Sequence, residues 1–300
     1  MNKNIFQKDV KELLSEMIAR MRQNGEPVNT EAEALLEKRI QDVLNYHPKI
    51  GILGKTGSGK SSLCNAIFGS DAAKIDDVKG CTRTPQEILI KFGESKSITL
   101  VDVPGVGESI ERDAEYRALY KSLLPQLDLV VWVVKADDRA LTVDQLVVMQ
   151  DLKPILNGTP FIVAINQVDK LNPLREWDAE NNQPGVRQMA SINEKSKLVA
   201  DFFSLDLERI IAVSAEEKFN LTKLVEGMVF ALPDSQKVGF FREIKQEYKS
   251  EKAEEEVKRG FMDTLLMIVE KVEKLYEEVK PYIPTIIKYG SMLFALLKKA

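Results

Sequence analysis

The sequence predicts an α/β fold in which helices cover both faces of a mostly parallel central sheet. Short apolar runs alternate with helical stretches over residues 49–232, the order that produces parallel strands joined by helical crossovers. Two of these runs, Leu127–Val134 and Pro160–Ile165, are almost continuously apolar, as expected of central strands buried on both faces. Polar motifs follow the strands directly, at the carboxyl ends where open α/β sheets bind their ligands.

The first of these motifs joins a short apolar strand to a helix that begins near Lys60. Its glycines allow successive backbone N–H groups to point inward, and the N-terminus of the following helix adds a positive dipole. The pattern predicts a phosphate-binding P-loop in which Lys60 reaches the β- and γ-phosphates and the Ser61 hydroxyl ligates Mg²⁺. The expected nucleotide-binding residues are Gly54, Lys55, Thr56, Gly57, Ser58, Gly59, Lys60, Ser61 and Ser62.

The rest of this region is predicted in chain order. We expect a hairpin of strands 86–92 and 97–102, helices near 111–124 and 142–153, a helix ending near 203, a strand at 210–213 and a helix at 220–232. The segment Asn172–Gly185 is rich in Asn, Pro and Gly and is interpreted as a surface insertion. Trp177 within it is interpreted as an anchor for the loop and not as a ligand-stacking residue.

The chain is expected to divide into an N-terminal helical segment (1–47), a nucleotide-binding domain (48–232) and a C-terminal helical segment (233–300). One long charged helical stretch is expected over Asp234–Gly260, continued by an amphipathic pattern. The apolar run Tyr282–Leu297 contains Pro284 and is shorter than the roughly 20 residues of a spanning helix. We expect it to pack against the N-terminal helices or a partner, and an interfacial membrane helix remains an alternative.

Composition excludes several function classes. The formal net charge of −4 provides no bulk attraction to nucleic acid or anionic lipid. The two cysteines show no pairing pattern or metal-ligand spacing, and the single histidine, His47, argues against a histidine-based triad or zinc site. The N-terminus lacks the apolar core of a signal peptide. These features favour a reduced, cytoplasmic setting, with peripheral membrane contact left open.

Two further motifs concern the triphosphate and its metal. Asp102-Val-Pro-Gly105 ends a predicted strand, where Asp102 can hold a water of the Mg²⁺ shell and the Gly105 N–H can meet the γ-phosphate. The polar loop Gly80–Thr84 is placed to supply a second hydroxyl ligand to the metal.

Two motifs concern the base. Asn166-Gln-Val-Asp169 follows a buried strand, and its Asp169 carboxylate can accept hydrogen bonds from the N1 and N2 hydrogens of guanine, a pair that adenine lacks. Val213-Ser214-Ala215-Glu216 follows the last strand, where a backbone N–H can meet guanine O6. The nucleotide-binding set therefore extends to Asn166, Gln167, Asp169, Ser214 and Ala215.

The order and spacing of these five motifs over residues 49–232 resemble the Era-like GTPases of the TrmE–Era–septin class. Within that class, the runs Gly54–Ala66, Asp102–Glu108 and Val134–Arg139 look most like the bacterial YfjP/YeeP-type proteins. The resemblance implies a P-loop GTPase with a Ras-like G domain and an added helical region built from the N- and C-terminal segments. Alignment with the family's Gly-Thr-Thr-Arg-Asp loop makes Thr82 the Mg²⁺-ligating threonine, beside Ser61 and Asp102. Lys60, Thr82 and Gly105 are then the expected catalytic residues.

The sequence departs from the family pattern at three positions. Gln167 replaces the usual lysine of Asn-Lys-x-Asp, which shortens the side chain that covers the base. Val106 stands where many relatives carry the glutamine that orients the attacking water. Gly57 replaces the asparagine of potassium-dependent relatives, so activation by potassium is not expected.

The hypothesis from the sequence is a GTPase switch that uses Mg²⁺ and hydrolyses GTP slowly, on the order of 10⁻⁴ to 10⁻² s⁻¹ as for unassisted G domains. A second subunit, a partner or a loop residue such as Arg83, Glu108 or Arg112 would accelerate it. Alternatives are a GTP-dependent dimerising or membrane-associating scaffold with little hydrolysis, and a ribosome- or RNA-associated GTPase. Residues 234–300 show no separate RNA-binding module, and an ATPase is the weakest alternative.

Overall fold

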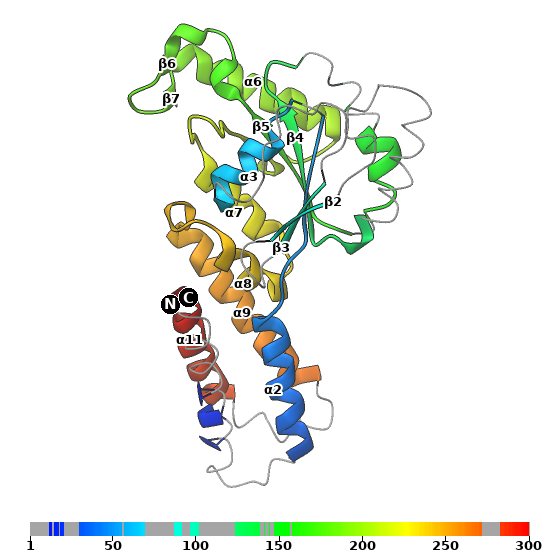
Figure 1. Cartoon of the computed structure of the whole chain (residues 1–300), viewed down its shortest axis with the longest axis vertical. Helices are drawn as coiled ribbons and strands as arrows, with labels where there is room; N and C mark the ends of the chain where they lie inside the picture. The colour runs from blue at the N-terminus through cyan, green and yellow to red at the C-terminus, as the bar shows by residue number, and fades with distance from the viewer. Residues whose placement is uncertain are drawn as a thin grey trace. The chain divides into compact units, whose positions relative to one another are not determined.

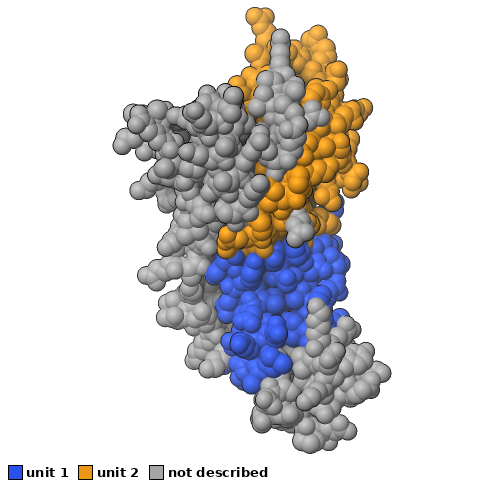
Figure 2. All heavy atoms as spheres, turned by 90° about the vertical axis from the view of Figure 1, so that its right-hand side faces the viewer, with its two compact units in different colours: residues 1–47, 233–243, 251–300 blue, residues 48–232, 244–250 orange. Residues whose placement is uncertain are grey.

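The computed structural model of the protein describes residues 12–13, 15–17, 19–20, 30–55, 57–69, 87–91, 97–101, 124–138, 141, 144, 147–156, 158–271 and 283–299. The chain forms two compact units (Figure 2). Unit 1 comprises residues 1–47, 233–243 and 251–300, and unit 2 comprises residues 48–232 and 244–250.

Unit 2 is built on a parallel sheet, and this confirms the predicted fold class. Its strands run in the order β1 (Ile50–Leu53), β4 (Leu129–Lys135), β5 (Phe161–Asn166) and β8 (Ile210–Ala212). All three pairings are parallel. All residues of β1 and β5, and all of β4 except Lys135, are buried, as the continuous apolar runs predict for strands covered on both faces.

Helices cover this sheet and complete its core (Figure 1). They are α3 (Lys60–Phe68), α6 (Val186–Phe203) and α7 (Leu221–Ala231). Helix α6 lies against β8, and α7 against β5 and β8. The core includes Trp132 of β4 and Val163 of β5, together with Val199 and Phe203 of α6. Residues Val147–Leu152 form a short π-helix, within the range 142–153 where the sequence predicts a helix.

A separate antiparallel hairpin consists of β2 (Glu87–Lys91) and β3 (Ser97–Val101), with Leu89 opposite Thr99. Strand β3 lies alongside β1. This hairpin is the one predicted from the sequence. The insertion at 172–185 contains a short helical turn (Leu174–Glu176) and the two-residue strands β6 (Trp177–Asp178) and β7 (Gln183–Pro184), which pair with each other.

The prediction of one long helix over Asp234–Gly260 is wrong. Helix α8 (Asp234–Glu243) ends, a 3₁₀ turn (Gln246–Tyr248) follows, and α9 (Glu251–Lys271) begins anew. The intervening residues 244–250 belong to unit 2. There the Lys245 N–H donates to the carbonyl of Ile67, and its Nζ to that of Asn65. These bonds tie residue 245 to the last turn of α3, and such tertiary contacts override helix propensity.

Unit 1 is helical and contains α2 (Thr30–Leu44), α8, α9 and α11 (Ile283–Lys299). Pro284 does not interrupt α11, because proline is tolerated in the first helical turn. Helix α11 approaches α9 closely at Gly290, where an added Cβ would lie 2.7 Å from Leu265. The Tyr289 hydroxyl donates to Glu16 at 2.9 Å. Among the described residues, no helix has both the length and the apolar content needed to cross a membrane.

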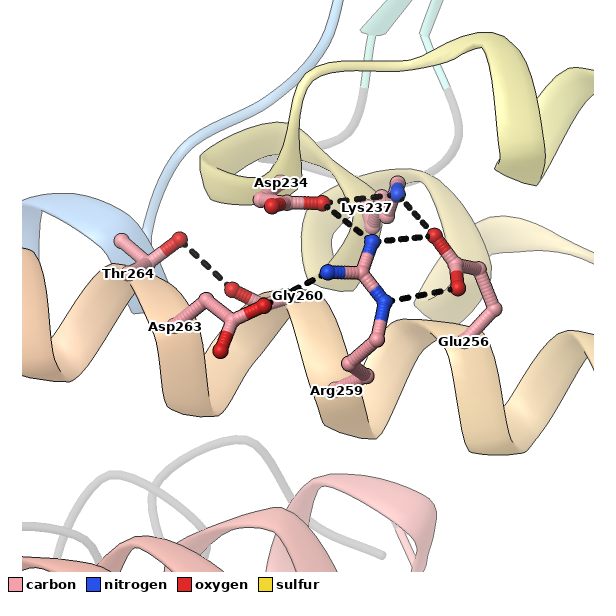
Figure 3. Close-up of polar contacts among 7 residues, drawn as sticks. All are labelled: Asp234, Lys237, Glu256, Arg259, Gly260, Asp263 and Thr264. Atoms are coloured by element: carbon pink, nitrogen blue, oxygen red, sulfur yellow. Dashed lines mark hydrogen bonds and ion pairs between the residues drawn. The ribbon is translucent and has the colours of Figure 1, made fainter.

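Ion pairs join α8 to α9 (Figure 3). Lys237 is almost fully buried, and its ammonium contacts Asp234 at 2.7 Å and Glu256. Arg259 donates from Nε to Glu256 Oε2 at 2.9 Å and from Nη2 to Asp234 at 3.1 Å. The hydrogen bond from Arg259, with that from Lys237, lowers the pKa of Glu256 to about 2.

Candidate nucleotide-binding site

The P-loop connects β1 to α3 and has a backbone that requires glycine at two close approaches. Gly54 has φ +146°, and an added Cβ would lie 2.3 Å from the carbonyl oxygen of Val133. Gly59 has φ +84°, and its Cβ would lie 2.4 Å from Asn166 Nδ2. A side chain at either position would displace β4 or Asn166. The loop is therefore held tightly between the ends of β4 and β5.

Lys60 is the first residue of α3 and is almost fully buried. Its Nζ donates to the carbonyls of Gly54 at 2.9 Å and Lys55 at 3.0 Å. The ammonium thus lies across the loop, where it can transfer these bonds to phosphate oxygens. This is the position predicted for a phosphate-binding lysine.

Lys55 also belongs to the predicted phosphate-binding set, but its side chain makes a different contact. Its Nζ lies 2.7 Å from Asp144 Oδ2 and 3.0 Å from Asp138 Oδ2. Asp144 is almost fully buried and also accepts a hydrogen bond from Trp132 Nε1 at 3.1 Å. Sequence reasoning missed these partners, and the only available signal was the acidic pair Asp137-Asp138 at the end of β4.

The charges in this network shift two pKa values. Burial disfavours the charge on Lys55, but the hydrogen bonds and charges of Asp144 and Asp138 outweigh it and raise the pKa of Lys55. Burial raises the pKa of Asp144, although Lys55 and Trp132 favour its charged form. Lys55 therefore remains protonated at neutral pH and ties the P-loop to the segments after β4.

Asn166, at the end of β5, joins two loops. It is almost fully buried. Its Nδ2 donates to the carbonyl of Ser58 at 3.0 Å, and its Oδ1 accepts the N–H of Ala215 at 3.0 Å. The P-loop and the Ser214–Ala215 loop are thereby held at the same side chain. The sequence-predicted motifs meet as expected at the carboxyl end of the sheet.

Gln167 follows with a left-handed backbone (φ 64°) and donates from Nε2 to the carbonyl of Gly57 at 3.1 Å. Glutamine at this position thus makes a side-chain hydrogen bond to the P-loop. Glutamine lacks the longer aliphatic stem of lysine.

Asp169 lies in the 3₁₀ turn Val168–Lys170. Its Oδ1 is buried and has no hydrogen-bond partner within the part of the chain that the structure describes. A buried carboxylate oxygen requires a donor, and the N1 and N2 hydrogens of guanine are suitable donors. Ser214 is fully buried and exchanges two backbone hydrogen bonds with Phe219, which fixes the loop predicted to meet O6.

Comparison with known proteins shows the family of the chain. Residues 49–167 match the family model described as "50S ribosome-binding GTPase". YkfA of Escherichia coli is 37% identical over 241 residues, which is 80% of this chain and 81% of YkfA. YfjP of the same organism is 36% identical with the same coverage. The protein belongs to this family of Era-like P-loop GTPases. GTPase Era of Alkaliphilus metalliredigens is 27% identical over 62% of this chain and 56% of Era, so the match spans about half of Era's length.

Of the three predicted Mg²⁺ ligands, only Ser61 lies among the residues that the structure describes. This residue is partly buried in the first turn of α3, and its hydroxyl is a suitable ligand for Mg²⁺. Thr82, Asp102 and Gly105 lie outside the described residues, as do Thr56, Arg83, Val106, Glu108 and Arg112. Among the residues that are described, no group of three or more His, Cys, Asp or Glu side chains could hold a metal ion, so Ser61 would need ligands from elsewhere.

Proposed function

We propose that the protein is a GTPase switch that recognises guanine through Asp169 and hydrolyses GTP slowly. The observation that carries the proposal is the junction at Asn166, which joins the P-loop to the Ser214–Ala215 loop at 3.0 Å on each side. The buried oxygen of Asp169, which has no partner among the described residues, lies in the turn that follows the same strand. This arrangement suits a nucleotide whose phosphates and base are bound by separate loops.

The GTPase family uses Mg²⁺ with GTP, and we assign Ser61, Thr82 and Asp102 to its coordination. The ion would neutralise charge on the β- and γ-phosphates. Lys60 would bind the same phosphates by transferring the bonds it makes to Gly54 and Lys55. Gly105 would offer its N–H to the γ-phosphate, and ordering of the loops near Thr82 and Gly105 would provide the switch.

Slow turnover is proposed because Val106 has no group that can hold the attacking water. A single-turnover assay with radiolabelled GTP and dilute protein should give about 10⁻² s⁻¹ or less, as for unassisted G domains. A rate above roughly 1 s⁻¹ from the dilute monomer would overturn the slow switch. A Lys60→Ala control measures the background.

A second candidate is a GTP-dependent scaffold that dimerises or touches a membrane and hydrolyses little GTP. The observation that favours it is the outer surface of α11, where the apolar side chains Ile287 and Met292 are exposed. Light scattering and co-sedimentation with anionic liposomes, each with GTP and GDP, would test it. Equal association in both nucleotide states would reject it. A cytoplasmic location and the division at 47/48 and 232/233 are proposed with either function.

Ribosome or RNA association is a weaker proposal. The matching family model is described as ribosome-binding, but this chain's net charge of −4 provides no general attraction to RNA. Failure to co-sediment with ribosomes in the presence of GTP would reject it.

A further inference from the structure

Gln188 is a fully buried amide in the first turn of α6. Its Nε2 donates to the carbonyl of Asp169 at 3.1 Å and to that of Leu171 at 2.8 Å. The first carbonyl belongs to the turn that carries the Asp169 carboxylate, and the second belongs to the residue that directly follows this turn. A single buried side chain therefore holds the backbone on both sides of Lys170, next to the carboxylate that would meet the base.

The insertion at 172–185 positions Gln188. Glu176 Oε2 accepts the backbone N–H groups of Arg187 at 2.9 Å and Gln188 at 3.3 Å. These are free donors at the start of α6, and a carboxylate stabilises them through charge and hydrogen bonding. The side-chain hydrogen bond from Arg187 lowers the pKa of Glu176, which keeps it charged. Gly185 allows the close approach, because an added Cβ would lie 2.8 Å from Glu176 Cβ.

The same insertion reaches the second base-binding loop through Trp177. The indole ring contacts the ring of Phe219 edge-on, with centroids 5.6 Å apart and planes at 81°. Phe219 in turn exchanges backbone hydrogen bonds of 3.0 and 3.2 Å with Ser214. The sequence interprets Trp177 as an anchor for its own loop, and the contact with Phe219 connects that loop to the Ser214–Ala215 loop.

We propose that the insertion braces the base pocket, and that Gln188 and Trp177 are positioning residues for purine recognition. The proposal rests on guanine recognition by Asp169. Gln188 sets the turn that faces the N1 and N2 hydrogens of guanine, and Trp177 sets the loop that faces O6. The two residues therefore control different edges of the base, and nucleotides that differ at those edges can separate them.

The test uses the full chain with Mg²⁺ and measures the dissociation constants of GDP, IDP and ADP by titration calorimetry. IDP keeps O6 and N1–H but lacks the 2-amino group, and ADP lacks all three guanine features. Gln188→Leu should weaken GDP binding about 10-fold and IDP binding about 3-fold, because a misplaced Asp169 loses the N2 bond first. ADP binding should not change. Gln183→Leu, at an exposed position of strand β7, is a matched control, and it should leave all three constants unchanged.

Trp177→Ala should weaken GDP and IDP equally, by about 5-fold, because both carry O6, with ADP unchanged. Trp177→Phe should restore most of this loss, since a phenyl ring can still contact Phe219. If Gln188→Leu does not fold, the comparison of Trp177→Ala with Trp177→Phe still tests the proposal. An equal loss for all three nucleotides in these variants, or no loss at all, would overturn the brace.

Failure of guanine recognition itself has a different signature. If the wild-type protein binds GDP and ADP with equal affinity, or if Asp169→Ala leaves the ratio of the two dissociation constants unchanged, guanine recognition by Asp169 is wrong. The positioning roles of Gln188 and Trp177 are then wrong as well. If Asp169→Ala abolishes the preference but Gln188→Leu and Trp177→Ala behave as wild type, only the brace is overturned.

Discussion

Replacing Asp144 with asparagine should destabilise unit 2 more than any other single change in the Lys55 network. The change removes the carboxylate 2.7 Å from Lys55 Nζ but keeps a shape that can still accept from Trp132. Removing one partner of a buried ion pair costs about 3–5 kcal/mol. Lys55 is 19% exposed and keeps Asp138 at 3.0 Å, so we expect a loss of about 2–3 kcal/mol in the free energy of unfolding.

Urea unfolding followed by tryptophan emission measures this loss in unit 2 alone, because both tryptophans, at 132 and 177, lie in that unit. Asp138→Asn is the matched control and should cost about 0.5–1 kcal/mol, because its side chain is more exposed. In a double-mutant cycle, Lys55→Met with Asp144→Asn should cost at least about 1 kcal/mol less than the two single changes added. Equal costs for Asp144→Asn and Asp138→Asn would refute the reasoning.

Three other changes have defined outcomes. Gly59→Ala should weaken GTP binding at least about 10-fold in titration calorimetry, because its Cβ would lie 2.4 Å from Asn166 Nδ2 at φ +84°; an affinity within twofold of wild type would contradict this. Gln167→Lys should tighten GTP binding by about 2–10-fold, since a longer aliphatic stem covers more of the base, and weaker binding would show that the bond to the P-loop matters more. The lowered pKa of Glu256, about 2 in the folded protein against an ordinary 4.5, contributes stability that is present above pH 4.5 and lost as the pH falls toward 2. Glu256→Gln should remove roughly 1–2 kcal/mol of that acid dependence, after allowance for the solvent around the half-exposed Arg259, in urea titrations followed by circular dichroism at pH 5 and pH 3; an unchanged difference between the two pH values would count against the pair.

Local patterns were sufficient for the parallel sheet and for the placement of the nucleotide motifs at the carboxyl ends of its strands. Continuous apolar runs specify buried strands, and the strand–glycine–helix order specifies the P-loop. The position of Asn166 and Asp169 could be predicted because their motif directly follows a strand, and strand ends in such sheets share one edge. Each of these features is encoded within a short stretch of sequence.

Contacts between distant segments could not be predicted in this way. The sequence places Lys55 in the P-loop but does not reveal its ion pair with Asp144, which is 89 residues away in the chain. Gln188 is an ordinary polar residue of a helix until the turn after β5 places two carbonyls beside it. The segment 244–250, which separates α8 from α9, contains no proline or glycine. We attribute the break to the hydrogen bonds that Lys245 makes to the last turn of α3. These features depend on tertiary packing, which overrides local propensity.

The most direct test of the central claim is the affinity of the full chain for GTP and ATP with Mg²⁺, in the wild type, Lys60→Ala and Asp169→Ala. Two charge-assisted hydrogen bonds to guanine predict that the wild type prefers GTP by about 100-fold or more. Lys60→Ala should weaken both nucleotides, and Asp169→Ala should abolish the preference while it leaves ATP binding unchanged. Equal affinity of the wild type for GTP and ATP, or a preference that survives Asp169→Ala, would contradict the account.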